Sequence, residues 1–423
     1  MNATSGSSPT SPRRVLITGR AAVMPIGEDL ETIRAALFAE PASHAADAFP
    51  VSDAAAYLGH LANWEPESLD RRTRTQMCDA AQYALVATQK ALADAGVDID
   101  QSDRNRIATL IGTMMAGLPE VVRIHGFLEK GKKSRAGGLG TTKLMNSAST
   151  VAVSAALGLR GPSLSVSSAL ATGLDNIGLG FEMIRSGEVD IAICGATEED
   201  SSEVLGPFIR HWDEEFGYDS SSSPRVPRPF DSSRTGPVMS VGSSIVVLES
   251  EESVSRRAAT PLAEIVSYDA GFSGKATGET DANHSEDQFG EALERAILSV
   301  LEQAPESMRA QIDHVLCGAA GFRQADSIHA TTLSKTVGAD CPVTSLRGLT
   351  GLPLGTGSAF DVLAAIEMQQ AGKLAATFGL NDPAEDCRSI RHVRRPETRE
   401  LRTSLVTAGG FGFGSAMLLL ATR

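Results

Sequence analysis

The same hydrophobic pattern occurs in two distant segments of the chain, residues 241–248 and 413–420. The first reads Val-Gly-Ser-Ser-Ile-Val-Val-Leu and the second Phe-Gly-Ser-Ala-Met-Leu-Leu-Leu. In each segment a Gly-Ser pair precedes a continuous apolar run. A run of this length next to a glycine is typical of a strand that is buried on both faces. The pattern therefore predicts one such strand near the end of each half of the chain.

A second pair of segments, residues 106–113 and 311–318, lies upstream of these strands. Both segments are rich in apolar residues and run into a glycine, which predicts a strand followed by a turn.

A third pair predicts a strand, a loop and a helix that a glycine ends. Glycine directly after the last helical turn stops a helix because it accepts a positive φ at low cost. The first copy is residues 163–167, residues 171–186 and Gly187, and the second copy is residues 343–346, residues 359–371 and Gly372.

Three matches in one order predict two similar α/β halves, residues 13–252 and 258–423. The charged stretch 250–260 marks the join between them. Hydrophobic residues make up 42% of the chain, which is enough for a large core. Only 5% of the residues are aromatic and 40 are glycine, which favours a layered α/β protein over a β-sandwich.

Charge and cysteine content narrow the choice of partners. The formal net charge of −14 argues against nucleic acid as a partner, because such a surface repels phosphate backbones. No run of eighteen apolar residues occurs, so no membrane span is expected. The five cysteines form no CxxC pair, which indicates reduced thiols in a cytoplasmic protein without a zinc site or a disulfide framework. Residues 1–12 are polar and rich in Ser, Thr and Pro, and we expect a disordered tail there.

Several motifs, in this order and spacing, resemble those of the β-ketoacyl-acyl-carrier-protein synthases. They are RVLITG at 14–19 with PIG at 25–27, LGLRGPS at 157–163 with TGLDNIG at 172–178, RPFD at 228–231 with Arg234 and Gly236, and FGFG at 411–414. The resemblance covers nearly the whole chain from residue 13. It implies the thiolase fold, in which two βαβαβαββ halves form a five-layered αβαβα sandwich.

The resemblance also places the family's catalytic positions on this sequence. Members of the family use a cysteine nucleophile, two histidines and a lysine, and the corresponding residues here are Leu170, Cys317, Leu352 and Arg347. The family's acidic GEGAG segment is replaced by SVGSS at 240–244. A leucine cannot form a thioester, and the general-base and carbonyl-binding groups are lost with it. We therefore expect no condensing activity, no cofactor and no metal.

A new catalytic site would need new residues. Cys317 is the sharpest candidate, but a buried cysteine more often acts as a small hydrophobic residue. Ser168 and Thr172 flank the Leu170 turn, and without an identifiable base we expect them to cap the helix. Five histidines fall in polar or helical stretches without metal-ligand spacing, and we expect them at the surface: His125, His211, His284, His329 and His392.

The family contains an inactive branch, the chain-length factors, which pair with an active ketosynthase in type II polyketide systems and help to shape the acyl tunnel. The resemblance assigns Met114, Met115, Leu118, Met145 and Asn146 to the tunnel wall and the dimer seam. Phe411 and Phe413 match the gating loop, which we expect to be retained for packing. The SSALATG turn at 167–173 is similar to fatty-acid-type synthases, which favours a reducing or polyene-making system.

The resemblance implies a second partner, an acyl carrier protein with a phosphopantetheine-linked acyl chain. Exposed Lys/Arg clusters steer an acidic partner, although a solvated loop would explain them equally well. The candidate docking residues are Arg71, Arg72, Arg74, Lys130, Lys132, Lys133 and Arg135.

Two other functions stay open at this point. One is a repurposed homodimer that carries out acyl transfer, hydrolysis or cyclisation with new residues. The other is a protein that binds acyl chains or carrier protein and has neither a catalytic role nor a ketosynthase partner.

Overall fold

The computed structural model describes residues 12–41, 61, 64–66, 68–132, 134, 140–202, 204–205, 226–274, 282–309 and 311–422, with only the backbone at 282–288. The predicted tail lies outside these residues except for Pro12. None of the helices in this part of the chain is long and apolar enough to cross a bilayer.

The first half has the element order βαβαβαββ. Its main elements are β1 (Val15–Val23), α3 (Asp79–Ala95), β2 (Ile107–Gly112), α6 (Ala148–Leu157), β3 (Ser163–Leu164), α7 (Thr172–Arg185), β4 (Ile191–Glu198) and β5 (Gly242–Ser250). Shorter helices between them are α1 (Leu30–Leu37), α2 (Arg71–Gln76), α4 (Leu118–Glu129) and α5 (Gly140–Leu144), with 3-10 turns at Ile99–Gln101, Arg104–Arg106 and Ala169–Ala171.

The second half repeats this order. Its main elements are β6 (Ala263–Phe272), α10 (Ala282–Gln303), β7 (His314–Leu316), α12 (Arg323–Thr336), β8 (Pro342–Thr344), α14 (Thr356–Ala371), β12 (Thr403–Gly410) and β13 (Phe413–Ala421). Smaller elements are α9 (Glu251–Arg256), α11 (Glu306–Arg309), α13 (Arg347–Thr350), β9 (Lys373–Leu374), β10 (Arg391–His392) and β11 (Glu397–Thr398), with a 3-10 turn at Glu385–Cys387.

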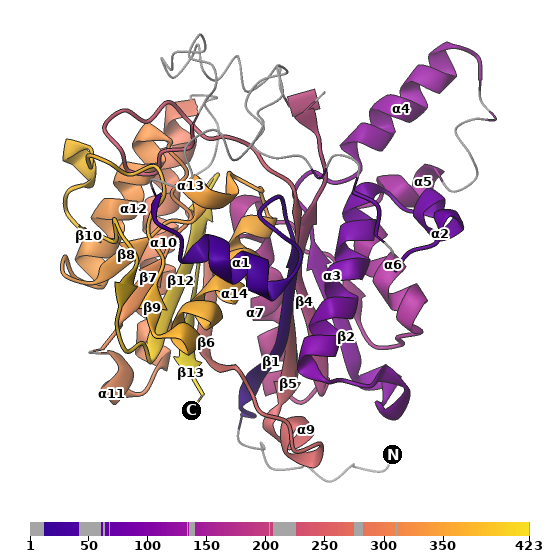
Figure 1. Cartoon of the computed structure of the whole chain (residues 1–423), viewed down its shortest axis with the longest axis horizontal. Coiled ribbons are helices and arrows are strands. Elements are labelled where there is room, and N and C mark those ends of the chain that lie inside the picture. Colours follow the sequence, from indigo (N-terminus) through magenta and orange to yellow (C-terminus); the bar gives the residue numbers. More distant parts are fainter. Residues whose placement is uncertain are drawn as a thin grey trace, which may run out of the picture.

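The strands of the two halves are arranged alike. Five strands of the first half lie in the order β3-β2-β4-β5-β1, and the related strands of the second half continue as β6-β13-β12-β7-β8. The two sets meet where residues 15–17 of β1 pair antiparallel with residues 263–265 of β6. Helices α3 and α6 cover the outer face of the first set of strands, and α10 and α12 cover the outer face of the second. Helices α7 and α14 lie between the two sets (Figure 1). This arrangement confirms the predicted five-layered αβαβα sandwich.

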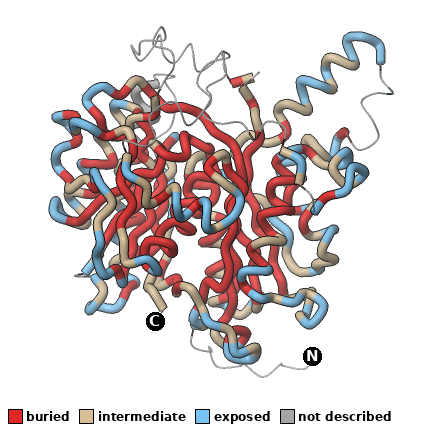
Figure 2. Tube along the Cα trace, viewed as in Figure 1, coloured by how far each residue is buried: buried red, intermediate tan, exposed pale blue. Residues whose placement is uncertain are grey.

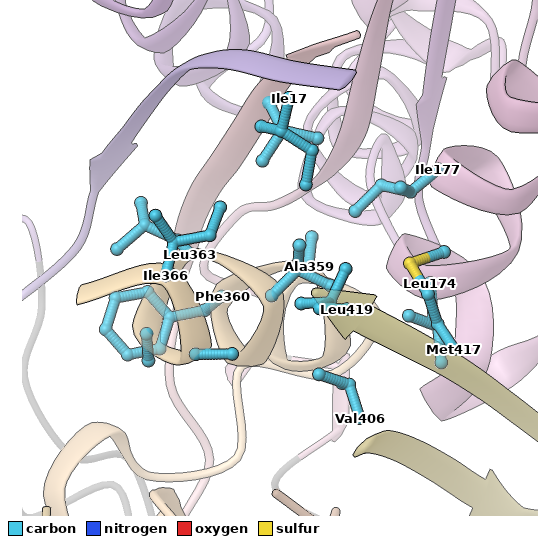
Figure 3. Close-up of a cluster of buried hydrophobic side chains, with 14 of the residues drawn as sticks. Ile17, Leu174, Ile177, Ala359, Phe360, Leu363, Ile366, Val406, Met417 and Leu419 are labelled. Atoms are coloured by element: carbon cyan, nitrogen blue, oxygen red, sulfur yellow. The ribbon is translucent and has the colours of Figure 1, made fainter. Parts of the chain in front are cut away.

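The central helix α14 is buried all round, from Thr356 to Gln369. It packs so closely against α7 that only glycine fits at position 173, where a Cβ atom would lie 2.7 Å from the Ala359 Cβ atom. Leu174 and Ile177 on α7 face Ala359 and Leu363 on α14 in one apolar core (Figure 3). Burial is concentrated in this central region, whereas α4 projects from the body with exposed and half-buried residues (Figure 2).

Strand β3 is shorter than the predicted 163–167, because it ends at Leu164. It lies at the edge of the sheet, with β2 as its neighbour. Beyond it, the backbone of Val166 bonds to the side-chain amide of Asn176 on α7 instead of continuing a strand ladder. The amide therefore turns the chain toward the start of α7.

A buried carboxylate links the two halves. Glu367 on α14 is fully buried and accepts hydrogen bonds from Arg20 Nε at 2.6 Å and from Arg34 Nε at 2.7 Å. Arg20 lies on β1 and Arg34 on α1, so one carboxylate fixes two elements of the first half to the central helix of the second.

We predict that Glu367→Gln lowers the free energy of unfolding by roughly 3 kcal/mol, because the buried Arg20 guanidinium loses its fully buried partner and keeps only Asp94 at 3.2 Å and the Gln370 amide oxygen at 2.7 Å. Urea denaturation measures the change. Glu385→Gln is the matched control, since the Glu385 side chain is 97% exposed in its ion pair with Arg388; it should change stability by less than about 0.5 kcal/mol. Equal effects of the two substitutions would contradict the linking role of Glu367.

Candidate functional site

Leu170 lies in a tight turn between β3 and α7. The 3-10 turn Ala169–Ala171 precedes the helix, and Ala169 has a φ of +51°. Left-handed backbone at a non-glycine residue costs about 1–2 kcal/mol and persists only where the surroundings enforce it. The surrounding structure therefore enforces the conformation of this turn, and Leu170 is the residue at its centre.

Leu170 and Leu352 belong to the same apolar cluster. Leu170, Met114 and Met115 pack against buried residues of this cluster, which include Leu352 and Leu354. Its other members are Leu205, Met239, Ala320 and Phe322. The structure thus brings together two of the positions that the resemblance assigns to catalysis and two of the predicted tunnel-wall methionines. Because every member is apolar, the cluster offers hydrocarbon packing and no group for proton transfer.

The hairpin turn between β12 and β13 closes over Leu170. A Cβ atom at Gly410 would lie 3.0 Å from the Leu170 Cδ1 atom. Phe411 follows with a φ of +52° and is 44% exposed. Phe413 packs edge-on against Phe272 with ring centroids 5.2 Å apart. Phe413 is thus packed in this hairpin, whereas Phe411 is largely exposed; their assignment to a gating loop stays a prediction.

Ser168 and Thr172 hold the turn, and the prediction that they cap the helix was wrong. The Ser168 hydroxyl donates to the Asp175 carboxylate, which also accepts from Tyr268 Oη at 2.9 Å and Ser415 Oγ at 2.6 Å. Thr172 is the first residue of α7, and its hydroxyl donates back to the Ala169 carbonyl at 2.7 Å. Neither hydroxyl caps α7; the Leu174 nitrogen in its first turn donates instead to Ser358 Oγ on α14 at 3.1 Å. Both hydroxyls are therefore engaged in local structure.

Cys317 lies in a different apolar cluster from Leu170. It follows β7, is fully buried, and shares its cluster with Phe289, Leu293 and Leu333. Burial raises the pKa of its thiol to about 12. Since the thiolate is the reactive form of cysteine, this thiol is inert at neutral pH. The structure therefore places Cys317 as a small hydrophobic residue.

Arg347 is buried and paired. Its guanidinium donates to both oxygens of Asp361, with Nη1 3.1 Å from Oδ1. Its Cζ atom would lie 2.9 Å from a Cβ atom at Gly357, so α14 passes directly beside it. Asp361 had no signal in the sequence, because the pair forms only when α13 meets α14. Asp361 neutralises the charge of Arg347, and the role of Arg347 is therefore structural.

His329 is buried, so the prediction of a surface histidine was wrong for this residue. Its ring packs against Phe289, and Nδ1 has no hydrogen-bond partner. Burial lowers its pKa to about 3, so the ring is neutral. The burial follows from spacing: Asp326, His329, Ala330 and Leu333 form one buried stripe at i, i+3, i+4 and i+7 of the polar helix α12. His125 is exposed, His392 is half-buried, and His211 and His284 lie where side chains are not described.

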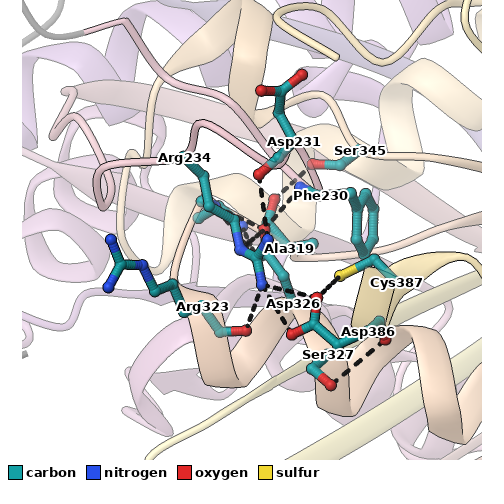
Figure 4. Close-up of polar contacts among 12 residues, drawn as sticks. Phe230, Asp231, Arg234, Ala319, Arg323, Asp326, Ser327, Ser345, Asp386 and Cys387 are labelled. Carbon is teal, nitrogen blue, oxygen red and sulfur yellow. Dashed lines mark hydrogen bonds and ion pairs between the residues drawn. The ribbon is translucent and has the colours of Figure 1, made fainter. Parts of the chain in front are cut away.

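Asp326 ties the RPFD motif to the loop after β7 (Figure 4). Its carboxylate accepts from the backbone nitrogens of Phe230 at 2.7 Å, Ala320 at 3.0 Å and Gly321 at 3.2 Å. Arg234 lies nearby, with Nε 3.9 Å from Oδ2. Since Ala320 is a member of the Leu170 cluster, this buried carboxylate holds part of the cluster in place.

The other predicted tunnel and dimer residues are exposed or half-buried. Met145 is 52% exposed, Asn146 is exposed, and Leu118 at the start of α4 is half-buried. Asn146 lies beside the end of β3, because Ser165 Oγ donates to its carbonyl at 3.0 Å. Further exposed apolar side chains in the same part of the chain are Val121, Val122 and Leu128 on α4, Val151 on α6 and Leu164 on β3.

Those of the predicted carrier-protein residues that the structure describes lie on α2 and just after the end of α4. Arg71 and Arg72 are exposed on α2, whereas Arg74 pairs with Glu65 at 3.2 Å. Together with Trp64, Asp79 and Tyr83, Arg71 and Arg74 line an open cavity of about 400 Å³. Lys130 and Lys132 are exposed at the end of α4, and Lys133 and Arg135 lie outside the described residues. Within the part of the chain that the structure describes, no group of three or more His, Cys, Asp or Glu residues could hold a metal ion.

Comparison with known proteins agrees with this geometry. The family models for the N-terminal and C-terminal domains of beta-ketoacyl synthases match residues 12–253 and 262–381. The chain belongs to the β-ketoacyl synthase family. It is 28% identical over 414 residues to the 3-oxoacyl-acyl-carrier-protein synthase 2 of Coxiella burnetii, which covers 95% of this chain and 96% of the relative.

Two solved structures of the family share the fold of this synthase-family chain. The ishigamide ketosynthase/chain length factor superposes with a TM-score of 0.81 at 22% identity, covering 98% of this chain and 100% of that chain. The type II polyketide ketosynthase AntDE, solved in complex with the acyl-carrier protein AntF, gives a TM-score of 0.80 at 21% identity, covering 97% and 100%.

We predict that the free energy of unfolding of the wild-type protein has a contribution from Asp326 that falls as the pH rises from 4 to 7, and that Asp326→Asn removes this contribution. Burial raises the pKa of Asp326 to about 7, whereas an unfolded aspartate has a pKa of about 4. The folded state therefore keeps a proton that the unfolded chain releases, and stability from this proton is lost as the pH rises through this window. Urea denaturation at pH 5, 6 and 7 measures the slope.

Asp190→Asn is the control for this pH effect. The hydrogen bonds from Arg106 hold the pKa of Asp190 below its usual value, so its contribution is lost only as the pH falls below about 4. The control should lower stability equally at pH 5, 6 and 7. A slope that Asp326→Asn leaves unchanged would show that Asp326 does not retain its proton in the folded state.

Proposed function

We propose that this chain is the non-condensing, chain-length-factor-like subunit of a heterodimer with an active ketosynthase. The observation that carries the proposal is Leu170, which occupies the nucleophile position in an apolar cluster that also contains Leu352. The family's frame is present, but the groups for thioester formation and decarboxylation are not at their positions. A subunit of this kind depends on a partner for the chemistry and contributes the shape of the acyl tunnel. A reducing or polyene-making type II system is the proposed setting.

The free edge of the sheet supports pairing with a second subunit. Strand β3 is the last strand at its end, and both of its residues are exposed. Leu164 on β3 is 45% exposed and Val151 on α6 is 50% exposed, beside the exposed Met145. An edge strand with exposed apolar neighbours favours association with another protein. The occupant we propose is a ketosynthase subunit of the same fold, whose corresponding edge would complete the sheet.

The surface of α2 supports contact with an acyl carrier protein. Arg71 and Arg72 are exposed in a chain that is otherwise strongly acidic. Arg74 is already paired with Glu65, so Arg71 and Arg72 are the cations of this set with the better access to an acidic partner. One structural neighbour is a ketosynthase in complex with its carrier protein. We propose that the carrier protein meets α2 while its acyl chain is extended in the partner.

The repurposed enzyme has less support. It would need a nucleophile, and Cys317 is buried with a pKa of about 12 for its thiol. The hydroxyls of Ser168 and Thr172 are engaged with Asp175 and with the Ala169 carbonyl.

We predict that the chain, tagged and isolated from its own host, carries a second subunit of similar mass at equal stoichiometry. The partner should react with a thiol-directed ketosynthase inhibitor, while this chain should not, because it has Leu170 at the nucleophile position. Native mass spectrometry measures both. Leu164→Lys should weaken the association by placing a charge at the sheet edge, and Leu298→Lys is the control, since Leu298 is an exposed leucine on α10. A homodimer without a reactive partner would refute the heterodimer.

We predict that substitutions at Met114, Met115 and Met145 shift the length of the product. In the heterodimer, alanine at these positions enlarges the wall region and should lengthen the product, whereas phenylalanine should shorten it. Mass spectrometry of the products measures the distribution. Met308→Ala is the control, because Met308 packs at the edge of the Cys317 cluster, away from Leu170. An unchanged distribution across all six variants would exclude these methionines as determinants of length.

A further inference from the structure

Glu198 is a fully buried carboxylate that contacts the backbone of Met114 and Met115, the two methionines of the apolar cluster. It is the last residue of β4 and points its oxygens at the loop that follows β2. Oε2 accepts from the Thr113 hydroxyl at 3.1 Å and from the Met115 backbone nitrogen at 3.1 Å, and Oε1 accepts from the Met114 backbone nitrogen at 2.5 Å. The loop that carries Met114 and Met115 is therefore bonded to one side chain.

The same carboxylate reaches the second half of the chain. It accepts from the backbone nitrogen of Gly355, and a Cβ atom at that glycine would lie 3.0 Å from Glu198 Oε1. Gly355 follows Leu354 of the apolar cluster. Its carbonyl accepts from the Gly173 nitrogen at 3.0 Å, which links it to the start of α7 just after Leu170. Glu198 is thus the point at which the methionine loop, the Leu352–Leu354 segment and the Leu170 turn are joined.

We infer that Glu198 is a positioning residue that sets where Met114 and Met115 stand relative to Leu170 and Leu354, and through them the wall that an acyl chain meets. The claim about the acyl chain rests on the proposed function, whereas the claim about position does not. No pattern in the sequence pointed to Glu198, because its four donors come from segments that meet only in the folded protein.

The chemistry of the site requires a carboxylate. Four donors converge on two oxygens, and an ionised carboxylate is an acceptor at every lone pair. Glutamine has the same size, but its NH₂ group is a donor and would face backbone N–H groups. Burial raises the pKa of Glu198 to about 7 in spite of the donors, so an acidic group is held here at an electrostatic cost. The neighbouring Glu199 fixes the next part of the loop, since it accepts from the Gly117 nitrogen at 2.5 Å.

Hydrogen exchange of the purified protein, in whatever complex it leaves its host, tests the position. The measurement is made at pH 8, above the raised pKa of Glu198, where the wild-type carboxylate is ionised. In Glu198→Gln at this pH, the amides of Met114 and Met115 should exchange about tenfold faster or more, because each loses a hydrogen bond to a charged acceptor. Glu249→Gln is the matched control: Glu249 is equally buried and accepts from Thr18, Ser253 and Arg257. It should leave exchange at Met114 and Met115 unchanged. Equal exchange of these two amides in wild type and Glu198→Gln would overturn the inference.

The product distribution of the heterodimer tests the consequence for the acyl wall. Glu198→Gln should shift product length in the same complex in which Glu249→Gln does not. Faster exchange with an unchanged product distribution would overturn the claim about the wall. Failure of the proposed function has a different signature, namely that no ketosynthase partner is found with the wild-type chain, and the exchange measurement decides the position of the loop in that case as well.

Discussion

Close packing of α7 against α14 is the constraint on which the other features of this protein depend. The two helices lie between the sheets, and contact at Gly173 leaves no room for a side chain. Because the interior is packed at the density of a crystal, the start of α7 can occupy only one place. That place sets the position of the Leu170 turn, of the hydrogen bond to the Gly355 carbonyl, and of Asp175, which accepts from Ser168, Tyr268 and Ser415. Because this frame is also the core, it would persist in a chain without the family's chemistry, as the proposed function requires.

The polar groups near the positions that the resemblance assigns to catalysis have structural roles. Arg347 is neutralised by Asp361, and Asp326 and Glu198 each bind backbone amides of loops that carry members of the Leu170 cluster. A buried polar group without partners costs stability, and these three groups, unlike the His329 Nδ1 atom, have hydrogen-bond partners. The region therefore combines an apolar interior with a polar outer frame. This combination suits a protein that shapes a hydrocarbon chain and does not react with it.

The surface features divide by charge and polarity. The sheet edge at β3 has exposed apolar side chains, whereas α2 has exposed arginines on an acidic protein. Apolar area gives lasting association, and exposed charge gives steering with modest affinity. A permanent subunit contact at one and a transient carrier-protein contact at the other would fit this division.

The sequence by itself determined the repeat, the layered α/β class and the identity of the residue at position 170, because these depend on local pattern and on residue identity. Buried strands and glycine-ended helices are visible in the order of residues, and a leucine at position 170 cannot form a thioester in any fold. The burial of His329 was also encoded in helical spacing, although the polar composition of α12 concealed it. Only the tertiary structure decided which polar groups meet. Asp361 with Arg347, Glu198 with Gly355 and Glu367 with Arg20 join residues from different segments, and their contacts exist only after the two halves pack around the central helices.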